Sequence, residues 1–489
     1  MRKTLAVAIA VAVTAVVAPG MAAAGMPSSQ TPGALRWGPC PADAVKPGLE
    51  CATVRVPLDY RHPKGRQIDI EISRLAGKNP GQRRGVLLTN PGGPGGAGLT
   101  YPVDLANPFW NLPKSVLDGY DLIGFDPRGV GHSTPVRCDL TAEQLAKGNF
   151  PSYANTPADV VREAAYAKKL AEQCATSETA DLLPFITTAN TARDMDRIRE
   201  ALGEKKISYL GASYGTYLGA VYTTLFPQRS DRIVLDSSLG PNGYDVTAFR
   251  NFARGMEERF PDFAKFATAD NAKYGLGTTP EQVRAKYFDL AARLDKQPSA
   301  DGFTGMLFRA FTFNAIYSDL GLDYLGRAWH ALDTGQPVPV LGGGEPAGDP
   351  DNGISSNITL VCNDSRWPRS IEAYQRAVEV DRAKYPMLGG STGNIKPCAF
   401  WPTPVEAPVR ITGHGPSNVL IVQNLRDPGT PLVGAKEMER ALGDRARMIT
   451  VDHGGHGVYP FDQNACANDK VSAFLAGGSQ LPQDAFCAA

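Results

Sequence analysis

The chain has 489 residues, of which 43% are hydrophobic and 20% are charged, an ordinary composition for a globular protein that excludes general disorder. This length exceeds the ~150 residues of a typical domain, so we expect one large unit or two fused ones. Lysine and arginine together number 50, as do aspartate and glutamate, so no overall charge favours nucleic acid or an anionic membrane as a partner.

The first 24 residues have the three-part layout of a secretory signal peptide. Arg2 and Lys3 form a basic start, Leu5 to Val17 is an apolar run, and Ala22 to Ala24 supplies small residues for cleavage. The apolar run is shorter than the ~20 residues that span a bilayer, as is every later run, which argues against a membrane anchor. We therefore predict a secreted protein with no membrane partner after cleavage, and a flexible segment rich in Ser, Pro and Gly over residues 25–36.

A secreted protein folds in an oxidising compartment, which affects what its eight cysteines are expected to do. None lies in a CxxC pair or at metal-site spacing from a histidine, so we expect no metal site. An even number of cysteines in an oxidising compartment favours disulfides, and loop entropy favours partners that are neighbours in sequence. The resulting hypothesis pairs Cys40 with Cys51, Cys138 with Cys174, Cys362 with Cys398 and Cys466 with Cys487.

Strand patterns of two kinds begin after residue 36. Residues 53–56 and 68–72 alternate apolar with polar side chains, as half-buried hairpin strands do. The later strand patterns are almost entirely apolar, as expected when helices cover both faces of a parallel sheet; they span residues 85–89, 120–125, 207–210, 232–235, 418–422 and 448–451. Helical patterns at 191–202 and 216–226 alternate with these strands, which predicts a doubly wound α/β sheet.

The alternation stops between residues 240 and 408. Helical patterns dominate there, at 248–263, 280–294, 322–332 and 371–384, and a Gly/Pro-rich loop at 336–353 interrupts them. We interpret residues 240–408 as a mainly helical cap inserted between two parts of an α/β core, 37–239 and 409–489.

The pentapeptide at residues 211–215 fits the pattern G-x-S-x-G, which alone occurs often by chance. Here an apolar strand pattern precedes it and a helix-compatible segment follows. That order is typical of the nucleophile elbow, in which a strained turn exposes a serine hydroxyl. We therefore predict Ser213 as a nucleophile; the alternative is a buried turn serine.

A serine nucleophile needs a histidine base oriented by a carboxylate, and after this elbow the acid and then the histidine follow in the chain. We favour His456, which has glycine on both sides in a loop after strand 448–451. His453 in the same loop is the alternative, and His414 precedes the late strands.

Asp427 is the predicted acid, because it lies in a polar turn five residues past the strand that ends at Val422. Asp236, at the end of strand 232–235, is the main alternative, since some hydrolases place the acid one strand earlier. Asp452 lies too close in sequence to His456 to be the first choice.

A glycine-rich segment, Asn90 to Gly96, directly follows strand 85–89. We predict that the backbone N–H groups of Gly93 and Tyr214 form an oxyanion hole. A phosphate-binding loop is the rival interpretation, but G-x-x-x-x-G-K-S/T is absent, as is a convincing acidic partner for a dinucleotide, so no cofactor is expected.

At these positions the chain closely resembles secreted bacterial tripeptidyl aminopeptidases, which are relatives of prolyl iminopeptidases in the α/β-hydrolase superfamily. The resemblance runs from Trp37 to the C-terminus and rests on residues 90–96, 124–133, 190–194, 209–217, 426–427 and 456–457. It implies an α/β-hydrolase fold, a triad of Ser213, Asp427 and His456 beneath a helical cap, and release of short peptides, expected to be tripeptides, from the free N-termini of oligopeptides.

Such an exopeptidase must hold the substrate ammonium, and carboxylates of the cap are expected to do so. Some members of the family carry a glutamate directly before the cysteine that corresponds to Cys362, where this chain has Val361. Asp364 is then a candidate ammonium ligand, with a structural turn beside a disulfide as the alternative.

Other functions remain open. A secreted esterase or other acyl hydrolase would use the same triad, and a prolyl iminopeptidase-like enzyme would release single residues. A non-catalytic binding protein would normally lack a triad member, and none is missing. Serine at position 213 disfavours epoxide hydrolases and haloalkane dehalogenases, which place aspartate there.

Overall fold

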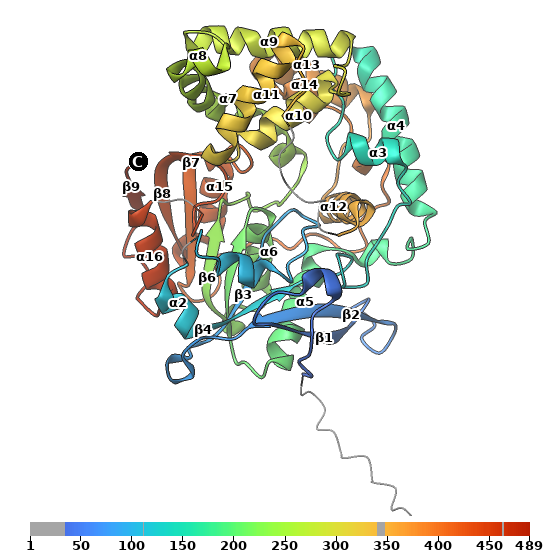
Figure 1. The fold of residues 1–489 in the computed structure, drawn as a ribbon. Coiled ribbons are helices and arrows are strands. Elements are labelled where there is room, and N and C mark those ends of the chain that lie inside the picture. Colours follow the sequence, from blue (N-terminus) through green and yellow to red (C-terminus); the bar gives the residue numbers. More distant parts are fainter. Residues whose placement is uncertain (1–34, 111, 340–347, 462–463) are drawn as a thin grey trace, which may run out of the picture. The chain divides into compact units, whose positions relative to one another are not determined.

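The structure is a computed structural model that describes residues 35–110, 112–339, 348–461 and 464–489. The predicted signal peptide and all but the last two residues of the predicted flexible segment lie outside these ranges. Within them, nine strands form one sheet in the order β1-β2-β4-β3-β5-β6-β7-β8-β9 (Figure 1). They are β1 (Leu49–Pro57), β2 (Gln67–Leu75), β3 (Gly85–Asn90), β4 (Tyr120–Phe125), β5 (Ile207–Ala212), β6 (Ser230–Asp236), β7 (Val419–Arg426), β8 (Ala446–Gly454) and β9 (Ala485–Cys487).

The sheet is mostly parallel. β1 and β2 form an antiparallel hairpin and β2 pairs antiparallel with β4, whereas every neighbouring pair from β4 to β9 is parallel. The hairpin strands are those with alternating patterns, and the parallel strands are those with apolar runs. The predicted α/β-hydrolase class, a mostly parallel sheet wound with helices, is confirmed.

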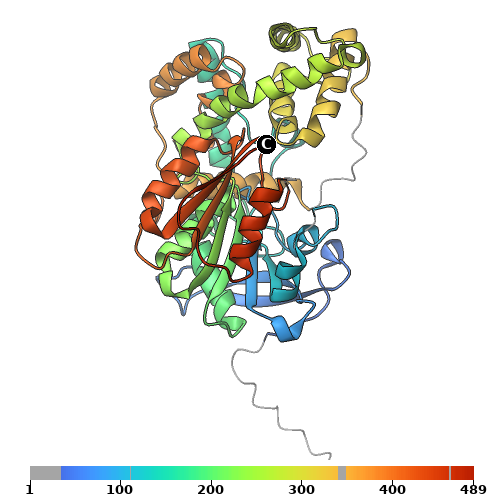
Figure 2. The same ribbon diagram turned by 90° about the vertical axis from the view of Figure 1, so that its left-hand side faces the viewer.

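Helices cover both faces of the sheet, which explains why its central strands are apolar throughout. All six residues of β3 are buried, and successive side chains alternate between two hydrophobic clusters: Val86 and Leu88 enter one and Leu87 the other. α5 (Thr188–Ala201), α6 (Tyr214–Leu225) and α15 (Leu432–Leu442) belong to the first cluster, and α1 (Tyr101–Leu105), α2 (Lys114–Gly119) and α16 (Ala465–Leu475) to the second. Figure 2 shows α15 and α16, in orange to dark red, on opposite sides of the strands.

A helical layer, which we call the cap, is inserted between β6 and β7. Its core is aromatic: the buried Trp329 ring packs on Phe260, Phe263 and Phe308 with centroids 5.1–6.1 Å apart. The cap helices are α7 (Val246–Ala269), α8 (Asn271–Tyr274), α9 (Pro280–Lys296), α10 (Gly305–Ala315), α11 (Leu322–Thr334), α12 (Pro350–Asp364), α13 (Ile371–Lys384) and α14 (Gly389–Thr392), followed by a 3₁₀ turn, Pro397–Phe400.

Two helices that precede the predicted cap belong to the same layer. α3 (Ala142–Lys147) and α4 (Pro157–Ala175) leave the core between β4 and α5 (Figure 1). Val160 and Ala164 of α4 join a buried cluster with Tyr374 and Val378 of α13. The helical layer therefore also includes helices before residue 240, because Val160 and Ala164 of α4 are buried against α13, whereas Leu170, Ala171 and Cys174 of α4 join the cluster that contains the sheet.

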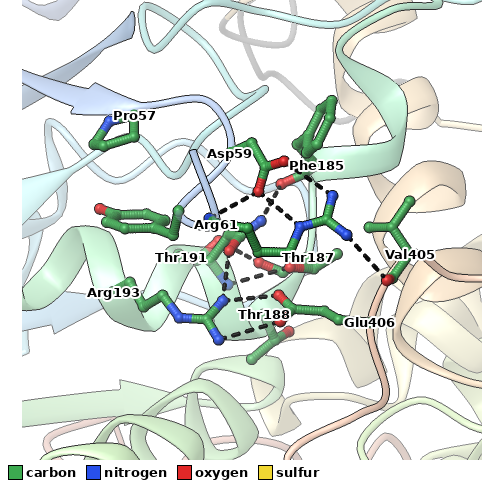
Figure 3. A network of polar contacts seen from close by, with 12 residues as sticks. Pro57, Asp59, Arg61, Phe185, Thr187, Thr188, Thr191, Arg193, Val405 and Glu406 are labelled. Atoms are coloured by element: carbon green, nitrogen blue, oxygen red, sulfur yellow. Dashed lines mark hydrogen bonds and ion pairs between the residues drawn. The ribbon is translucent and has the colours of Figure 1, made fainter. Parts of the chain in front are cut away.

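The segment that returns from the cap to β7 is held against the core by two arginines (Figure 3). Arg193 of α5 forms a bidentate ion pair with Glu406, with N–O distances of 2.7 and 3.2 Å. Arg61 donates to the carbonyl oxygen of Val405 at 3.4 Å and is itself held by Asp59. The exit of the cap is thereby fixed to the hairpin side of the core.

Four disulfides join Cys40 to Cys51, Cys138 to Cys174, Cys362 to Cys398 and Cys466 to Cys487, the same sequence neighbours that loop entropy favours. Four disulfides are typical of proteins in oxidising compartments. Within the described ranges, no helix is long and apolar enough to cross a membrane.

Candidate active site

Ser213 stands at the sharp turn between β5 and α6. Its backbone has φ 57° and ψ −123°, a strained conformation for a residue with a side chain. The turn requires glycine two residues earlier, since a Cβ on Gly211 would lie 2.5 Å from the carbonyl oxygen of Gly215. Ser213 is 8% exposed and lines a cavity beneath the cap. This is the geometry of a nucleophile elbow.

Asp427 and His456 meet at the carboxyl ends of β7 and β8. The Nδ1 atom of His456 lies 2.9 and 3.0 Å from the two carboxylate oxygens of Asp427. Asp427 is fully buried and also accepts hydrogen bonds from the backbone N–H groups of Gly429 and Thr430, both at 2.8 Å. These hydrogen bonds fix the position of the carboxylate independently of its contact with the imidazole.

The cap holds His456 from the other side. The backbone N–H of His456 donates to the carbonyl oxygen of Tyr317, in the turn after α10, at 2.7 Å. The Tyr317 ring packs edge-on against the imidazole, with centroids 4.8 Å apart. The orientation of His456 therefore depends on cap and core together.

The carboxylate of Asp427 also controls the protonation of the imidazole. Burial disfavours the charged ring, but the negative charge of Asp427, its hydrogen bond to Nδ1 and the more distant charge of Asp236 outweigh burial. The pKa of His456 is therefore raised above its ordinary value. A more basic imidazole is better suited to accept a proton from a serine hydroxyl.

Asp236, the alternative acid, has a different position. Its buried carboxylate accepts from the backbone N–H groups of Val458 and Tyr459 and from the hydroxyl of Ser237. Burial raises the pKa of Asp236 to about 7 in spite of these bonds. Asp236 thus anchors the loop that follows His456 and does not hydrogen-bond to its ring.

The other residues considered for the triad lie apart from Ser213. His453 contacts Asp319, with Nε2 3.2 Å from the carboxylate, and does not line the cavity that Ser213 lines. Asp452 pairs with Arg426 at 2.7 Å. Among the candidate acids and histidines, Asp427 and His456 form a side-chain hydrogen bond with each other.

The glycine-rich segment after β3 lies directly against the serine. Gly92 has φ +98°, and a Cβ there would come within 2.5 Å of the Ala212 carbonyl oxygen and 2.9 Å of the Ser213 Cβ. Among the bonds formed by the described residues, none engages the backbone N–H of Gly93 or of Tyr214. Both N–H groups, which the sequence singles out, are available to a ligand oxygen.

The cavity that contains Ser213 and His456 measures about 360 Å³. Its walls are mainly aromatic and come from the start of α7, the turn after α10 and the segment between α3 and α4; they include Phe150, Tyr244, Phe249, Phe252 and Tyr317. Tyr244 lines the cavity together with Ser213, and burial raises the pKa of Tyr244 to about 12. Asn149, Asn357 and Lys396 supply polar atoms. Val361 of α12 also lines this cavity.

A second hollow of about 500 Å³ shares Pro91, Tyr317 and His456 as lining residues with the first. Phe109, Trp110, Leu320 and Phe461 give it an apolar surface.

Asp364, the candidate ligand for a substrate ammonium, lies away from the cavity that Ser213 lines. Asp364 ends α12 facing α5, where it accepts from the backbone N–H and the hydroxyl of Thr188 at 2.9 and 2.5 Å. It is 8% exposed and does not line the cavity of Ser213. Asp364 stands one helical turn beyond Val361, and its side chain contacts a different element. Burial raises its pKa to about 7.

Lys396 is a charged residue of the cavity that the sequence analysis does not predict, and the same holds for the polar Asn149 and Asn357. Lys396 lies directly before the turn Pro397–Phe400 and is 6% exposed. No sequence signal marks it, because its neighbours in space, Asn149 and Phe249, come from two other segments.

The chain is similar to known proteins along most of its length. The family model described as "TAP-like protein" matches residues 385–487. The chain is 34% identical over 470 residues to a tripeptidyl aminopeptidase of Streptomyces lividans, covering 93% of this chain and 86% of the relative. It is 32% identical over 461 residues to carboxylesterase B of Mycobacterium tuberculosis, covering 90% and 86%. It is 28% identical over 486 residues to the serine protease Hip1 of the same species, covering 93% and 91%.

Among solved structures, the proline iminopeptidase of Mycobacterium smegmatis aligns over 86% of this chain and 97% of its own, with 14% identity and a TM-score of 0.40. The sequence relationship to the Streptomyces enzyme is much stronger and extends over nearly the whole chain. The chain therefore belongs to the tripeptidyl aminopeptidase family of serine hydrolases with the α/β-hydrolase fold.

Proposed function

We propose that this chain is a secreted serine peptidase that releases short peptides, with tripeptides as the expected product, from the N-terminal end of oligopeptides. The observation that carries the proposal is one cavity lined by a strained serine and by a histidine paired with a buried carboxylate. The relatives named tripeptidyl aminopeptidase and serine protease support a peptide as the substrate.

In the proposed mechanism, the Ser213 hydroxyl attacks the scissile carbonyl while Nε2 of His456 takes its proton. The carboxylate of Asp427 accepts a hydrogen bond from the Nδ1–H group, keeps the imidazole in the required tautomer and stabilises the imidazolium. The oxyanion of the tetrahedral intermediate receives hydrogen bonds from the N–H groups of Gly93 and Tyr214.

Collapse of this intermediate breaks the C–N bond, and His456 gives its proton to the departing amine. A water molecule, deprotonated by His456, then attacks the acyl-enzyme; the released peptide leaves with a new carboxylate, and Ser213 regains its proton. Loss of either backbone donor of the oxyanion hole would cost ~2.7–4 kcal/mol of transition-state stabilisation.

Two features support exopeptidase action rather than cleavage within long chains. The cap covers Ser213, and the cavity of about 360 Å³ falls within the ~300–1,000 Å³ usual for small-molecule pockets. A folded protein chain could not pass through such a space, whereas a short end of a peptide could enter it.

Secretion is proposed from the signal-like segment at residues 1–24, whose basic start, apolar run and small-residue end precede a chain with four disulfides. N-terminal sequencing of the protein recovered from the culture medium tests it; a start near residue 25 is expected, and retention of Met1 in the cell would contradict it.

A second candidate is hydrolysis of carboxylic esters, favoured by the aromatic walls of the cavity and by the relative named carboxylesterase B. Mass spectrometry of the products from a mixed peptide library, with wild type and Ser213→Ala, separates the two. Peptides shortened by three residues only in the presence of Ser213 support the proposal; removal of single residues indicates a prolyl iminopeptidase-like enzyme. Intact peptides together with hydrolysed p-nitrophenyl esters indicate an esterase.

A further inference from the structure

The cavity beside Ser213 has an unexpected charge for a site that receives the N-terminal end of a peptide. Among the described residues that line it, no side chain is a carboxylate, and the one cation besides the imidazole is Lys396. A free peptide ammonium would find no negative partner on these walls. The charge of this cavity is therefore complementary to an anion.

Lys396 is buried with few partners. Its Nζ donates to the carbonyl oxygen of Asn149 at 3.1 Å and lies 3.7 Å from the centroid of the Phe249 ring. An ammonium has three N–H donors, and the described residues supply one hydrogen-bond acceptor and one aromatic face. At 6% exposure, water satisfies little of the remainder. Burial accordingly lowers the pKa of Lys396 to about 7.

The negative charge of Glu163 of α4 raises the pKa of Lys396, but it does not neutralise the ammonium. Glu163 binds the ammonium of Lys147 with both oxygens, at 2.8 and 2.9 Å. Lys396 thus remains an uncompensated cation at the wall of the cavity, where a low dielectric strengthens its attraction for an anion. Purely structural burial of a charge without a partner is costly, which makes a ligand partner the better explanation.

We propose that Lys396 selects substrates whose acyl part, the portion transferred to Ser213, contains a carboxylate: an aspartate or glutamate side chain within the released peptide. The inference rests on the proposed function for the reaction but concerns binding alone. It predicts that an acidic side chain is preferred over its neutral amide at one position of the released peptide, because only the acid forms an ion pair with Lys396.

Binding to the Ser213→Ala variant tests the proposal without requiring turnover. The probes are trialanine amides with glutamate or glutamine at each position in turn; their C-terminal amide leaves the side chain as the sole carboxylate. Isothermal titration calorimetry at pH 6 is expected to give at least tenfold tighter binding of the glutamate peptide at one position, equal to ~1.4 kcal/mol. Equal affinities at all three positions would overturn the proposal.

The variants Lys396→Met and Lys169→Met, each in the Ser213→Ala background, assign the preference to this residue. Methionine keeps the length of the side chain and removes its charge, and Lys169 is an exposed lysine of α4 in the same helical layer. The glutamate preference should vanish in Lys396→Met, persist in Lys169→Met and be retained in part by Lys396→Arg. A preference that survives in Lys396→Met contradicts the proposal even though the peptides bind.

Kinetics with the corresponding tripeptidyl nitroanilides separates this inference from the proposed function. If wild type cleaves none of them, the proposed function fails, while the calorimetric comparison still decides the role of Lys396. If wild type cleaves them with equal kcat/KM for glutamate and glutamine at every position, the proposed function stands and the role of Lys396 is refuted.

Discussion

Replacement of Asp427 by asparagine tests the proposed triad with a minimal change of shape. One carboxylate oxygen accepts the N–H groups of Gly429 and Thr430, both at 2.8 Å, so the oxygen of asparagine must occupy that position. The amide NH₂ then takes the place of the other oxygen, 3.0 Å from Nδ1 of His456, while the amide oxygen stays 2.9 Å from Nδ1. The amide oxygen can still accept from an Nδ1–H group, but the NH₂ beside it donates and favours the tautomer in which Nδ1 accepts and the ring proton is on Nε2.

A proton on Nε2 prevents His456 from accepting the proton of Ser213. The expected loss in kcat is ~10⁴-fold, equivalent to about 5.5 kcal/mol, because the wrong tautomer is stabilised and the imidazolium loses its counter-charge. The packing is nearly unchanged, so the thermal midpoint should move little and KM should stay within a few-fold of wild type.

The assay is steady-state hydrolysis of a tripeptidyl nitroanilide, with circular dichroism as the check on folding. Asp452→Asn is the matched control, because Asp452 lies near the end of β8, four residues before His456, but pairs with Arg426 at 2.7 Å, and its side chain is 46% exposed. We expect that control to retain kcat within about twofold. A folded Asp427→Asn variant with kcat within tenfold of wild type would refute the role assigned to Asp427.

Four further predictions concern the surroundings of the site. Asp236→Asn leaves one buried backbone N–H without an acceptor, so the free energy of unfolding should fall by ~1–3 kcal/mol and kcat should fall with it; an unchanged urea midpoint would contradict this. Because His456 must be neutral to act as a base and its pKa is raised, kcat/KM should fall with decreasing pH at a midpoint above ~6.5; an acid limb centred below pH 6 would refute the assignment. In the folded protein the pKa of Lys396 is lowered to about 7, so protonation of Lys396 destabilises the fold; this destabilisation grows as the pH falls from ~10 to 7 and has its full size below pH 7. The free energy of unfolding, measured with urea, should therefore be higher in Lys396→Met than in wild type by a few kcal/mol at pH 6 and differ little at pH 10. Removing the disulfide between Cys362 and Cys398 as a double serine variant should lower unfolding free energy by ~2–5 kcal/mol, and an unchanged midpoint in non-reducing urea would argue against the bond.

The sequence predicts the sheet and the region around Ser213 well because their determinants are local. An apolar run that ends in a glycine-flanked serine and continues as a helix leaves few alternatives for the backbone, and the turn at Asp427 follows its strand within five residues. The choice between Asp427 and Asp236 was open because both end parallel strands; only the positions of the loops after β7 and β8 separate them.

The walls of the cavity could not be predicted in the same way. Asp364 looked suitable because it is a cap carboxylate near a cysteine, yet one turn of α12 separates it from Val361 and aims it at Thr188. The place of Lys396 in the cavity depends on contacts between the segment before the turn Pro397–Phe400, Asn149 and the start of α7. No pattern in the sequence indicates these contacts. Contacts between elements far apart in sequence, rather than patterns within one element, decide what this cavity binds.

The position of the cap in the chain also sets the order in which the site is completed. Ser213 is synthesised before α7 to α14, whereas Asp427 and His456 come after these helices, just beyond the ends of β7 and β8. Domains emerge from the ribosome from the N-terminus onward, so a nascent or truncated chain that ends within the cap contains the nucleophile without a base. In the proposed mechanism, hydrolysis at Ser213 therefore requires the part of the chain that is synthesised last.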